Sequence, residues 1–284
     1  MDDAKLAALM GTITPLNQTK KHAKIVLYGG SGAGKTVLST TVGNRILYVD
    51  SHEGWVSLDD FPELKKKCHR MQYLAVGGLA QLEAMCEAFE QKVEWFMQFD
   101  TIVLDEASQM AMLDLDVVLA ARSKNDPSKD PNVATQPDYN SNTQRMRRLF
   151  SRLVQLDVNL VIVAHQREDK DNVNRIYFGP DFTPKLSKTI KQFCHIVGRL
   201  TAKEVESDTE TKYEWSLQVR PTTYIDAKCR IRSLPVVVKN PNLGTIIDEW
   251  QASGSVEEEG DNEVVPDPTA DEFDAENSDN ILSI

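Results

Sequence analysis

The sequence predicts an α/β fold in which helices cover a doubly wound, mainly parallel sheet. Short apolar runs recur along the chain, amphipathic segments separate them, and a glycine-rich loop follows the first run. Runs of four to six residues rich in β-branched or aromatic side chains are typical of buried parallel strands. We expect such strands at residues 25–28, 46–49, 71–76, 101–104 and 160–164. Strands that alternate with helices favour a doubly wound sheet.

Between these strands, the clearest helix is expected over residues 79–96. Apolar side chains recur there every three or four positions, at Leu79, Leu82, Cys86, Phe89, Val93 and Phe96. Two stretches interrupt the alternation. Residues 122–142 are polar and contain three prolines, and residues 168–184 follow directly on a predicted core strand. We expect both to be long loops, which are usually functional or mobile.

The chain after residue 196 changes character. Strand-like segments at residues 196–201, 213–219 and 235–238 predict β-rich, antiparallel additions at the edge of the sheet. We therefore divide the chain into an N-terminal segment (1–19), an α/β core (20–250) and a tail (251–284). Residues 4–10 of the first segment are expected to form a short helix, which is a candidate for docking onto another protomer.

The net charge of −11 arises in the tail. Eleven acidic residues and no lysine or arginine lie between residues 251 and 284, so the rest of the chain is neutral and could still carry a basic face. Such a tail buries too little apolar surface to fold, and we expect it to be disordered. No apolar run is long enough for a membrane span, and the four cysteines are scattered. The sequence thus predicts a cytoplasmic protein without a membrane partner.

A phosphate-binding loop follows the first predicted strand and precedes a helix that should run to about residue 42. The pattern Gly-x4-Gly-Lys-Ser/Thr is satisfied by Gly29, Gly30, Ser31, Gly32, Ala33, Gly34, Lys35 and Thr36. In such loops the backbone N–H groups converge on phosphate oxygens, the lysine reaches the β and γ phosphates, and the hydroxyl binds Mg²⁺. We therefore expect a nucleoside triphosphate site, for ATP with Mg²⁺.

Polar residues follow three of the other predicted strands. Asp105 ends the strand at residues 101–104 and is the predicted magnesium residue together with Thr36. Glu106, directly after it, and Glu53, just past the second strand, are both candidates for the base that activates water. His165 and Gln166 end a later strand, where one of them could sense the γ phosphate. The residues alone leave the choice of base open.

With these motifs the sequence resembles the RecA-like recombinase ATPases, and within them the compact phage single-strand annealing ATPases. The resemblance covers roughly residues 20–245. Beside the phosphate-binding loop, it rests on Asp50 and Glu53, Asp105, His165 and Gln166, Tyr139, the basic residues Arg145, Arg147 and Arg148, and finally Lys228, Cys229 and Arg230. It implies that Lys228 and Arg230 act on a neighbouring protomer's nucleotide, that Glu53 is the base, and that Gln166 switches the following loop.

The resemblance implies a phage-type recombination ATPase that assembles as a ring or filament on single-stranded DNA and promotes annealing or strand pairing. Two alternatives stay open: an AAA+ type DNA remodeller such as a helicase loader, and a nucleotide-gated interaction protein. A remodeller would have a helical lid after the sensor strand. The apolar tip of the tail, residues 281–284, is similar to the partner-binding tails of single-strand-binding proteins. The tail is also expected to compete with DNA for basic surface.

Overall fold

The computed structural model of the protein describes Met10, Ile13 and residues 19–66, 68–170, 173–206 and 211–253. Most of the predicted N-terminal helix and the acidic tail from residue 254 lie outside these residues. Nearly all the helices and strands that can be compared with the sequence predictions therefore belong to the predicted core. No helix of the described part is both long and apolar enough to cross a lipid bilayer.

A mixed sheet of ten strands forms the centre of the described part, in the order β10-β8-β7-β1-β5-β4-β2-β3, with β6 beside β5 and β9 beside β7. Its strands are β1 (Lys24–Gly29), β2 (Ile46–Asp50), β3 (Met71–Ala75), β4 (Thr101–Asp105), β5 (Asn159–Lys170), β6 (Ile176–Pro180), β7 (Ile196–Glu206), β8 (Thr211–Gln218), β9 (Lys228–Cys229) and β10 (Val237–Lys239). Six neighbouring strands of this sheet run parallel: β7, β1, β5, β4, β2 and β3.

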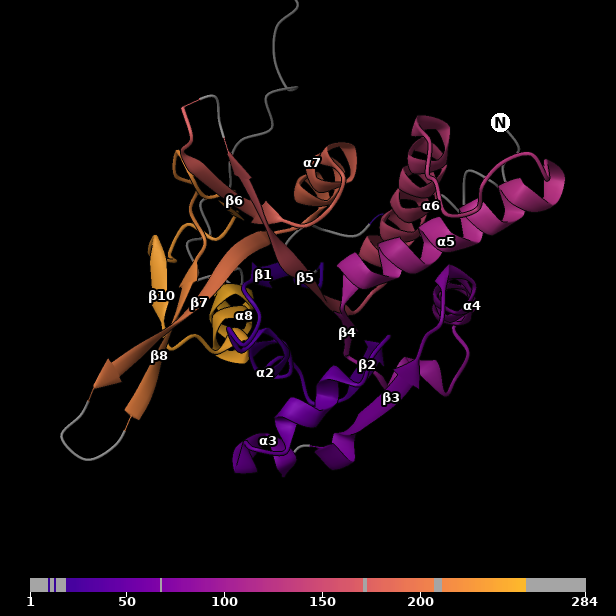
Figure 1. Ribbon diagram of the computed structural model, residues 1–284. Coiled ribbons are helices and arrows are strands. Elements are labelled where there is room, and N and C mark those ends of the chain that lie inside the picture. The colour runs from indigo at the N-terminus through magenta and orange to yellow at the C-terminus, as the bar shows by residue number, and fades with distance from the viewer. Residues whose placement is uncertain are drawn as a thin grey trace, which may run out of the picture.

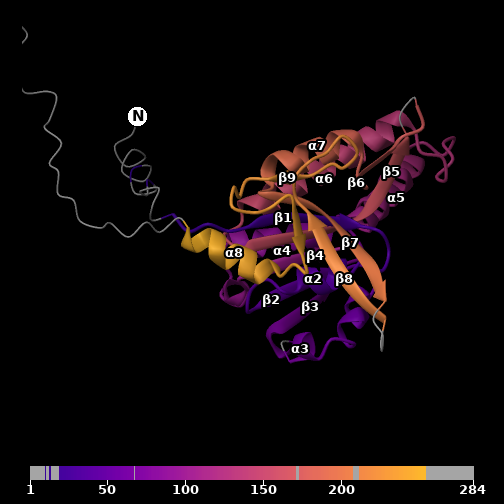
Figure 2. The same ribbon diagram turned by 90° about the vertical axis from the view of Figure 1, so that its left-hand side faces the viewer.

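Helices cover both faces of this sheet (Figure 1, Figure 2). The α-helices are α2 (Lys35–Ser39), α3 (Pro62–Lys65), α4 (Leu79–Glu90), α5 (Ala107–Asn125), α6 (Gln136–Gln155), α7 (Pro184–Phe193) and α8 (Leu243–Ala252), and the short 3-10 turns are η2 (Gly54–Leu58), η3 (Cys68–Arg70) and η4 (Phe96–Gln98). Helices α4 to α7 pack on one face, where Leu82, Met110 and Phe150 are fully buried. The other face carries α2 and α8, with Leu38 and Ile247 in its core.

The predicted strands are confirmed as parallel by their pairing, and every residue of β1, β2 and β4 is buried, whereas the edge strand β3 is largely exposed. A strand that is covered on both faces must be apolar at every position, which is what the short apolar runs indicated. The doubly wound α/β class is therefore confirmed. Two helices are shorter than expected: α2 ends at Ser39 and α4 at Glu90.

The prediction of a loop over residues 122–142 is wrong at both ends, where the chain is helical. Helix α5 continues to Asn125 and α6 begins at Gln136, so only the segment between them is irregular. Thr135 and Asp138 form a capping box that starts α6, and a proline in the first turn is compatible with a helix because no N–H bond is lost there. Pro137 thus marks a helix start, whereas Pro127 and Pro131 lie in the irregular segment. Arg122 holds the segment by donating to the carbonyl oxygens of Asp130 and Val133.

The second predicted loop, residues 168–184, is a β-hairpin. Strand β5 does not stop at the sheet edge but runs on to Lys170, and β6 returns antiparallel to it from Ile176. The additions after residue 196 are partly as predicted. Strands β8 and β10 are antiparallel, whereas β7 pairs in parallel with β1 and therefore extends the core sheet itself. These differences arise because strand partners are set by tertiary contacts.

Candidate functional site

The register of the parallel strands brings the predicted site residues to one edge of the sheet. Gly29 of β1 lies opposite His165 of β5, and Asp50 of β2 lies opposite Asp105 of β4. Gly29, Asp50 and Asp105 are the last residues of their strands, and His165 is the last residue of β5 that pairs with β1. Ligands of open α/β sheets bind outside this edge, so the glycine-rich loop and the polar residues face the same space.

The glycine-rich loop turns tightly because two of its glycines adopt conformations that L side chains rarely take. Gly32 has φ 74° and Gly34 has φ 86°. A Cβ atom at Gly29 would lie 2.3 Å from the carbonyl oxygen of Leu200, and one at Gly34 would lie 2.8 Å from the indole nitrogen of Trp215. Larger residues would therefore displace the loop. Successive backbone N–H groups in such turns form a concave site for anions.

Lys35 and Thr36 place their polar groups at this edge. The Nζ atom of Lys35 donates to the carbonyl oxygens of Gly29 and Gly30, at 3.2 and 3.1 Å. The Thr36 hydroxyl donates to Oδ2 of Asp105 at 2.7 Å. The structure thus brings together the hydroxyl and the carboxylate that the sequence predicts as the magnesium pair, and hard oxygen ligands of this kind suit Mg²⁺.

The described residues contain no group of three His, Cys, Asp or Glu side chains arranged to hold a metal ion. Magnesium is commonly bound through one or two protein groups and the substrate phosphates, with water completing the octahedron. Thr36 and Asp105 fit that mode, since they offer two adjacent oxygens beside the anion-binding loop. The site therefore suits Mg²⁺ that arrives with a nucleotide.

Tyr48 belongs to this site, although no pattern in the sequence indicated it. Its hydroxyl donates to Oδ2 of Asp105 at 2.5 Å. Burial raises the pKa of Asp105, while the bonds from Tyr48 and Thr36 act in the opposite direction. Burial also raises the pKa of Tyr48, which keeps its hydroxyl a donor at neutral pH. Tyr48 therefore orients the carboxylate and favours its charged form.

Glu106 lies buried beside Asp105 and faces two histidines. The Nδ1 atom of His165 is 2.8 Å from Oε1 of Glu106, and Nε2 of His52 is 3.8 Å from Oε2. The first contact lacks hydrogen-bond geometry, and Oε1 has no hydrogen-bond partner among the described groups. Burial raises the pKa of Glu106 to about 7, with Lys35 opposing the rise. A buried oxygen without a partner marks a place for a ligand or a water molecule.

Glu53 sits in a turn that Asp50 builds. The fully buried carboxylate of Asp50 accepts hydrogen bonds from the backbone N–H groups of His52, at 3.0 Å, and Gly54, at 2.6 Å. Glu53 between them has φ 61°, a conformation uncommon for residues with a side chain. Its side chain is exposed. Such strain often accompanies a functional position, and here it leaves one carboxylate open to solvent at the site edge.

Gln166 connects the site edge to the β5–β6 hairpin. Its Oε1 accepts from Nε of Arg199 on β7, and its Nε2 donates to Glu168 on the hairpin, at 2.8 and 2.9 Å. The guanidinium of Arg199 lies 3.7 Å from the ring centre of Phe178 on β6. Burial lowers the pKa of Arg199. The amide of Gln166 therefore lies between the nucleotide edge and both strands of the hairpin.

Lys228 and Arg230 lie at the opposite edge of the sheet. Lys228 pairs with Val197, which is opposite Val26 near the beginning of β1, whereas the phosphate-binding loop follows the end of β1. Lys228 donates to the carbonyl oxygen of Lys191, and Arg230 donates to that of Gln192 at 2.8 Å. Both cations therefore cap the C-terminal end of α7 and do not join the protomer's own nucleotide site.

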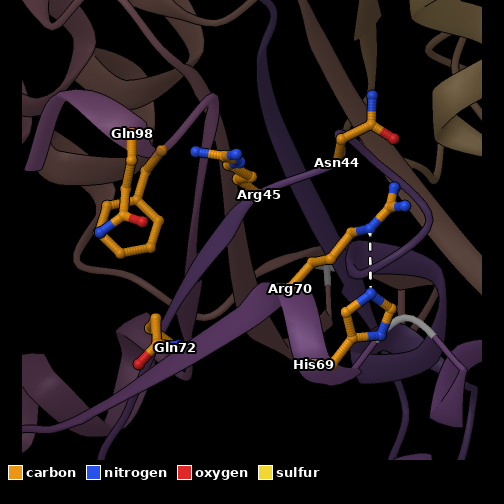
Figure 3. A pocket seen from close by; sticks show the side chains of 7 residues that line it. Asn44, Arg45, His69, Arg70, Gln72 and Gln98 are labelled. Carbon is orange, nitrogen blue, oxygen red and sulfur yellow. Dashed lines mark hydrogen bonds between the residues drawn. The ribbon is translucent and has the colours of Figure 1, made fainter.

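A cavity of about 650 Å³ also lies away from the phosphate-binding loop (Figure 3). It opens at the amino ends of β2, β3 and β4 and is lined by polar and basic side chains together with one phenyl ring: Asn44, Arg45, His69, Arg70, Gln72, Gln98 and Phe99. The Nε atom of Arg70 donates to Nε2 of His69 at 3.2 Å. Because it occupies the other edge of the sheet, this cavity takes no part in the nucleotide site.

The comparison with protein families agrees with this geometry. A family model described as an AAA domain matches residues 21–231, which include the loop, Asp105, Gln166 and Arg230. The chain belongs to this family. The match makes the protein an AAA-type, nucleotide-binding P-loop ATPase. No curated protein matches the sequence.

The role of Tyr48 can be tested through magnesium. We expect Tyr48→Phe to raise the Mg²⁺ concentration needed for half-maximal ATP hydrolysis, because partners of ligating carboxylates are commonly worth about 10–100-fold in affinity or activity. A magnesium titration of the hydrolysis rate measures this shift. Tyr73→Phe is the matched control, since Tyr73 stacks on Tyr48 at 6.5 Å and would keep its ring. Equal shifts in both variants would contradict the role.

Proposed function

We propose that the protein is a RecA-like recombination ATPase that hydrolyses ATP and assembles on single-stranded DNA to promote annealing or strand pairing. The observation that supports this most is the path of β5. The strand passes His165 and Gln166 at the nucleotide edge and continues without a break to Lys170 in the hairpin. Loss of the γ phosphate at the nucleotide site would thus be transmitted along β5 to the hairpin of β5 and β6.

The hairpin has a composition suited to single strands. Basic residues Lys170 and Arg175 are exposed, and the aromatic residues Tyr177 and Phe178 stand on β6. Single-stranded nucleic acids are bound by cations that contact phosphates and by aromatic rings on which bases stack. The exposed residues Arg147 and Arg148 of α6 add further positive charge to the described part of the chain.

Within the proposed reaction, each site residue has a distinct task. Lys35 and the backbone of the loop hold the phosphates, and Tyr48 orients Asp105. Mg²⁺, when bound, neutralises the charge that develops during phosphoryl transfer. Glu53 accepts the proton of the attacking water, and Gln166 passes the state of the site to the hairpin. Catalysis of this kind depends on positioning and electrostatics.

An AAA+ type DNA remodeller is the second candidate, and the Asp105–Glu106 pair favours it because Glu106 is buried beside the magnesium residue. That candidate requires a helical lid after the sensor strand. The described residues between Ile196 and Lys239 instead form strands β7 to β10, followed by the single helix α8 against α2. The geometry therefore supports the RecA-like candidate better.

DNA-stimulated hydrolysis tests the proposal. We expect single-stranded DNA to raise the ATPase rate, and Lys35→Ala to abolish hydrolysis with and without DNA. Lys170→Ala/Arg175→Ala should weaken DNA binding and reduce the salt slope of the binding constant by about 1.4, or roughly 0.7 per lost phosphate contact. Lys203→Ala/Lys212→Ala, on the β7–β8 hairpin, is the matched control. A rate that is indifferent to DNA would exclude the proposed function.

The assignment of the base gives a ranking. We expect Glu53→Gln to lower the turnover number more than Glu106→Gln, with ATP still bound in both variants. The pH profile of hydrolysis provides an independent measurement. A base role for Glu106 would give activity that rises as the pH passes about 7, because only the deprotonated carboxylate accepts a proton. The reverse ranking, with that rise lost in Glu106→Gln, would favour the remodeller.

The positions of Lys228 and Arg230 suggest a role between protomers. Neither reaches its own loop, so we expect each to act on a neighbour's nucleotide. An arginine finger is worth roughly 10³–10⁵ in rate. Mixtures of Lys35→Ala and Arg230→Ala protomers should regain activity, since some interfaces then pair an intact loop with an intact finger. If mixed assemblies regain no ATPase activity, the role between protomers is contradicted. The two cations would then only cap the C-terminal end of α7.

A further inference from the structure

The cavity at the amino ends of β2, β3 and β4 is chemically suited to anions (Figure 3). The side chains that line it include two arginines, a histidine and three amides, and no carboxylate. Its volume of about 650 Å³ lies within the roughly 300–1,000 Å³ that is typical of ligand sites. Asn44, Arg45, His69 and Arg70 are exposed, so an incoming group can reach them. We call this the basic cavity.

The two arginines of the basic cavity are available to a ligand. The side chain of Arg45 has no hydrogen-bond or ion-pair partner among the described residues. Arg70 donates from Nε to His69 at 3.2 Å, and its terminal nitrogens pair with no carboxylate of the described part. The carboxylate of Asp100 is engaged by the backbone N–H groups of Asn44 and Arg45, at 2.9 and 3.1 Å. Guanidinium groups bind carboxylates strongly and often through two parallel hydrogen bonds.

The C-terminal end of α8 lies close to the basic cavity. A neighbouring cavity of about 370 Å³ shares Asn44, Gln98 and Phe99 with it, and α8 lines that neighbour with Gln251. The side chain of Gln251 donates to the carbonyl oxygen of Lys21 at 2.8 Å, which fixes this end of the helix. The chain that follows α8 therefore starts beside the basic cavity.

The sequence after α8 supplies the complementary charge. Residues 254–284 carry eleven acidic side chains and no lysine or arginine. The first three, Glu257, Glu258 and Glu259, follow Gln251 by only six to eight positions. An extended chain covers about 3.3 Å per residue, so these carboxylates lie within roughly 20–26 Å of the helix end. A short tether of this kind gives an effective concentration in roughly the millimolar range, at which weak contacts form.

We propose that residues 257–259 dock in the basic cavity, where their carboxylates pair with Arg45 and Arg70. The site takes an acidic peptide segment, and the chain's own tail is that segment. Nucleic-acid phosphate is the other anion that these guanidinium groups suit, but it would have to displace carboxylates that are tethered beside them. Docking would hold the tail at the edge of the sheet opposite to the nucleotide site. The inference goes beyond the proposed function, and its test requires no nucleotide.

Cleavage of the full-length protein by a glutamate-specific protease tests the inference. Intact mass spectrometry measures how fast chains that end at residue 257, 258 or 259 appear. We expect Arg45→Gln/Arg70→Gln to raise this rate on the order of threefold to tenfold at low salt, the scale of two ion pairs at a protein surface, because released glutamates become accessible. The ratio of variant to unsubstituted rate should fall toward one as added salt screens the pairs and releases the tail of the unsubstituted protein.

Arg147→Gln/Arg148→Gln is the matched control, since it removes two exposed arginines of α6 that lie outside the cavity wall. It should leave the cleavage rate unchanged, and an equal acceleration in the control would contradict a specific site. Arg45→Gln alone repeats the test if the double variant does not fold. An unchanged rate in the folded cavity variants would overturn the inference. If that result came with weaker binding of a single-stranded oligonucleotide, the basic cavity would instead serve nucleic acid.

Discussion

The pairing of β1 with β5 and of β4 with β2 is the constraint on which the site depends. The register that sets Gly29 against His165 and Asp50 against Asp105 places three carboxyl strand ends and the point where β5 leaves the parallel sheet at one edge. Strands β1, β2 and β4 are buried along their length and covered on both faces, so a shift by one residue would exchange the side chains that pack in the two cores. The hydrophobic core thus fixes the positions of the polar groups, and the loop, Thr36 and Asp105 come together as its consequence.

The same edge concentrates acidic groups. Asp50, Asp105 and Glu106 are all buried there, and Lys35 is the nearby cation that opposes the rise in pKa of the last two. Asp50 is compensated by two backbone N–H groups and Asp105 by two hydroxyls, but one oxygen of Glu106 has no hydrogen-bond partner among the described groups. Buried charge of one sign is unfavourable unless it is paired. The site is therefore arranged to gain free energy when a cation and its ligand arrive.

Local patterns in the sequence predicted the parts of the fold that local chemistry decides. The glycine-rich loop, Asp105 and the buried strands follow from residue types at fixed spacing, and the structure places each as expected. The contacts of Tyr48 with Asp105 and of Trp215 with Gly34 could not be predicted, because each looks like an ordinary strand residue and its partner is distant in sequence. The prediction of a loop over residues 122–142 was wrong for another reason, because Pro137 lies in the first turn of α6, where proline is tolerated.

Strand β5 is a single extended element from the centre of the sheet to the hairpin, with Asn159 at one end and Lys170 at the other. The backbone of its inner half pairs with β1 and β4, while the backbone of its outer half pairs with β6 alone among the strands of the described part. A strand that is held at one end moves most at its other end. A small rotation of the backbone at His165 or Gln166 would therefore become a larger displacement at Lys170.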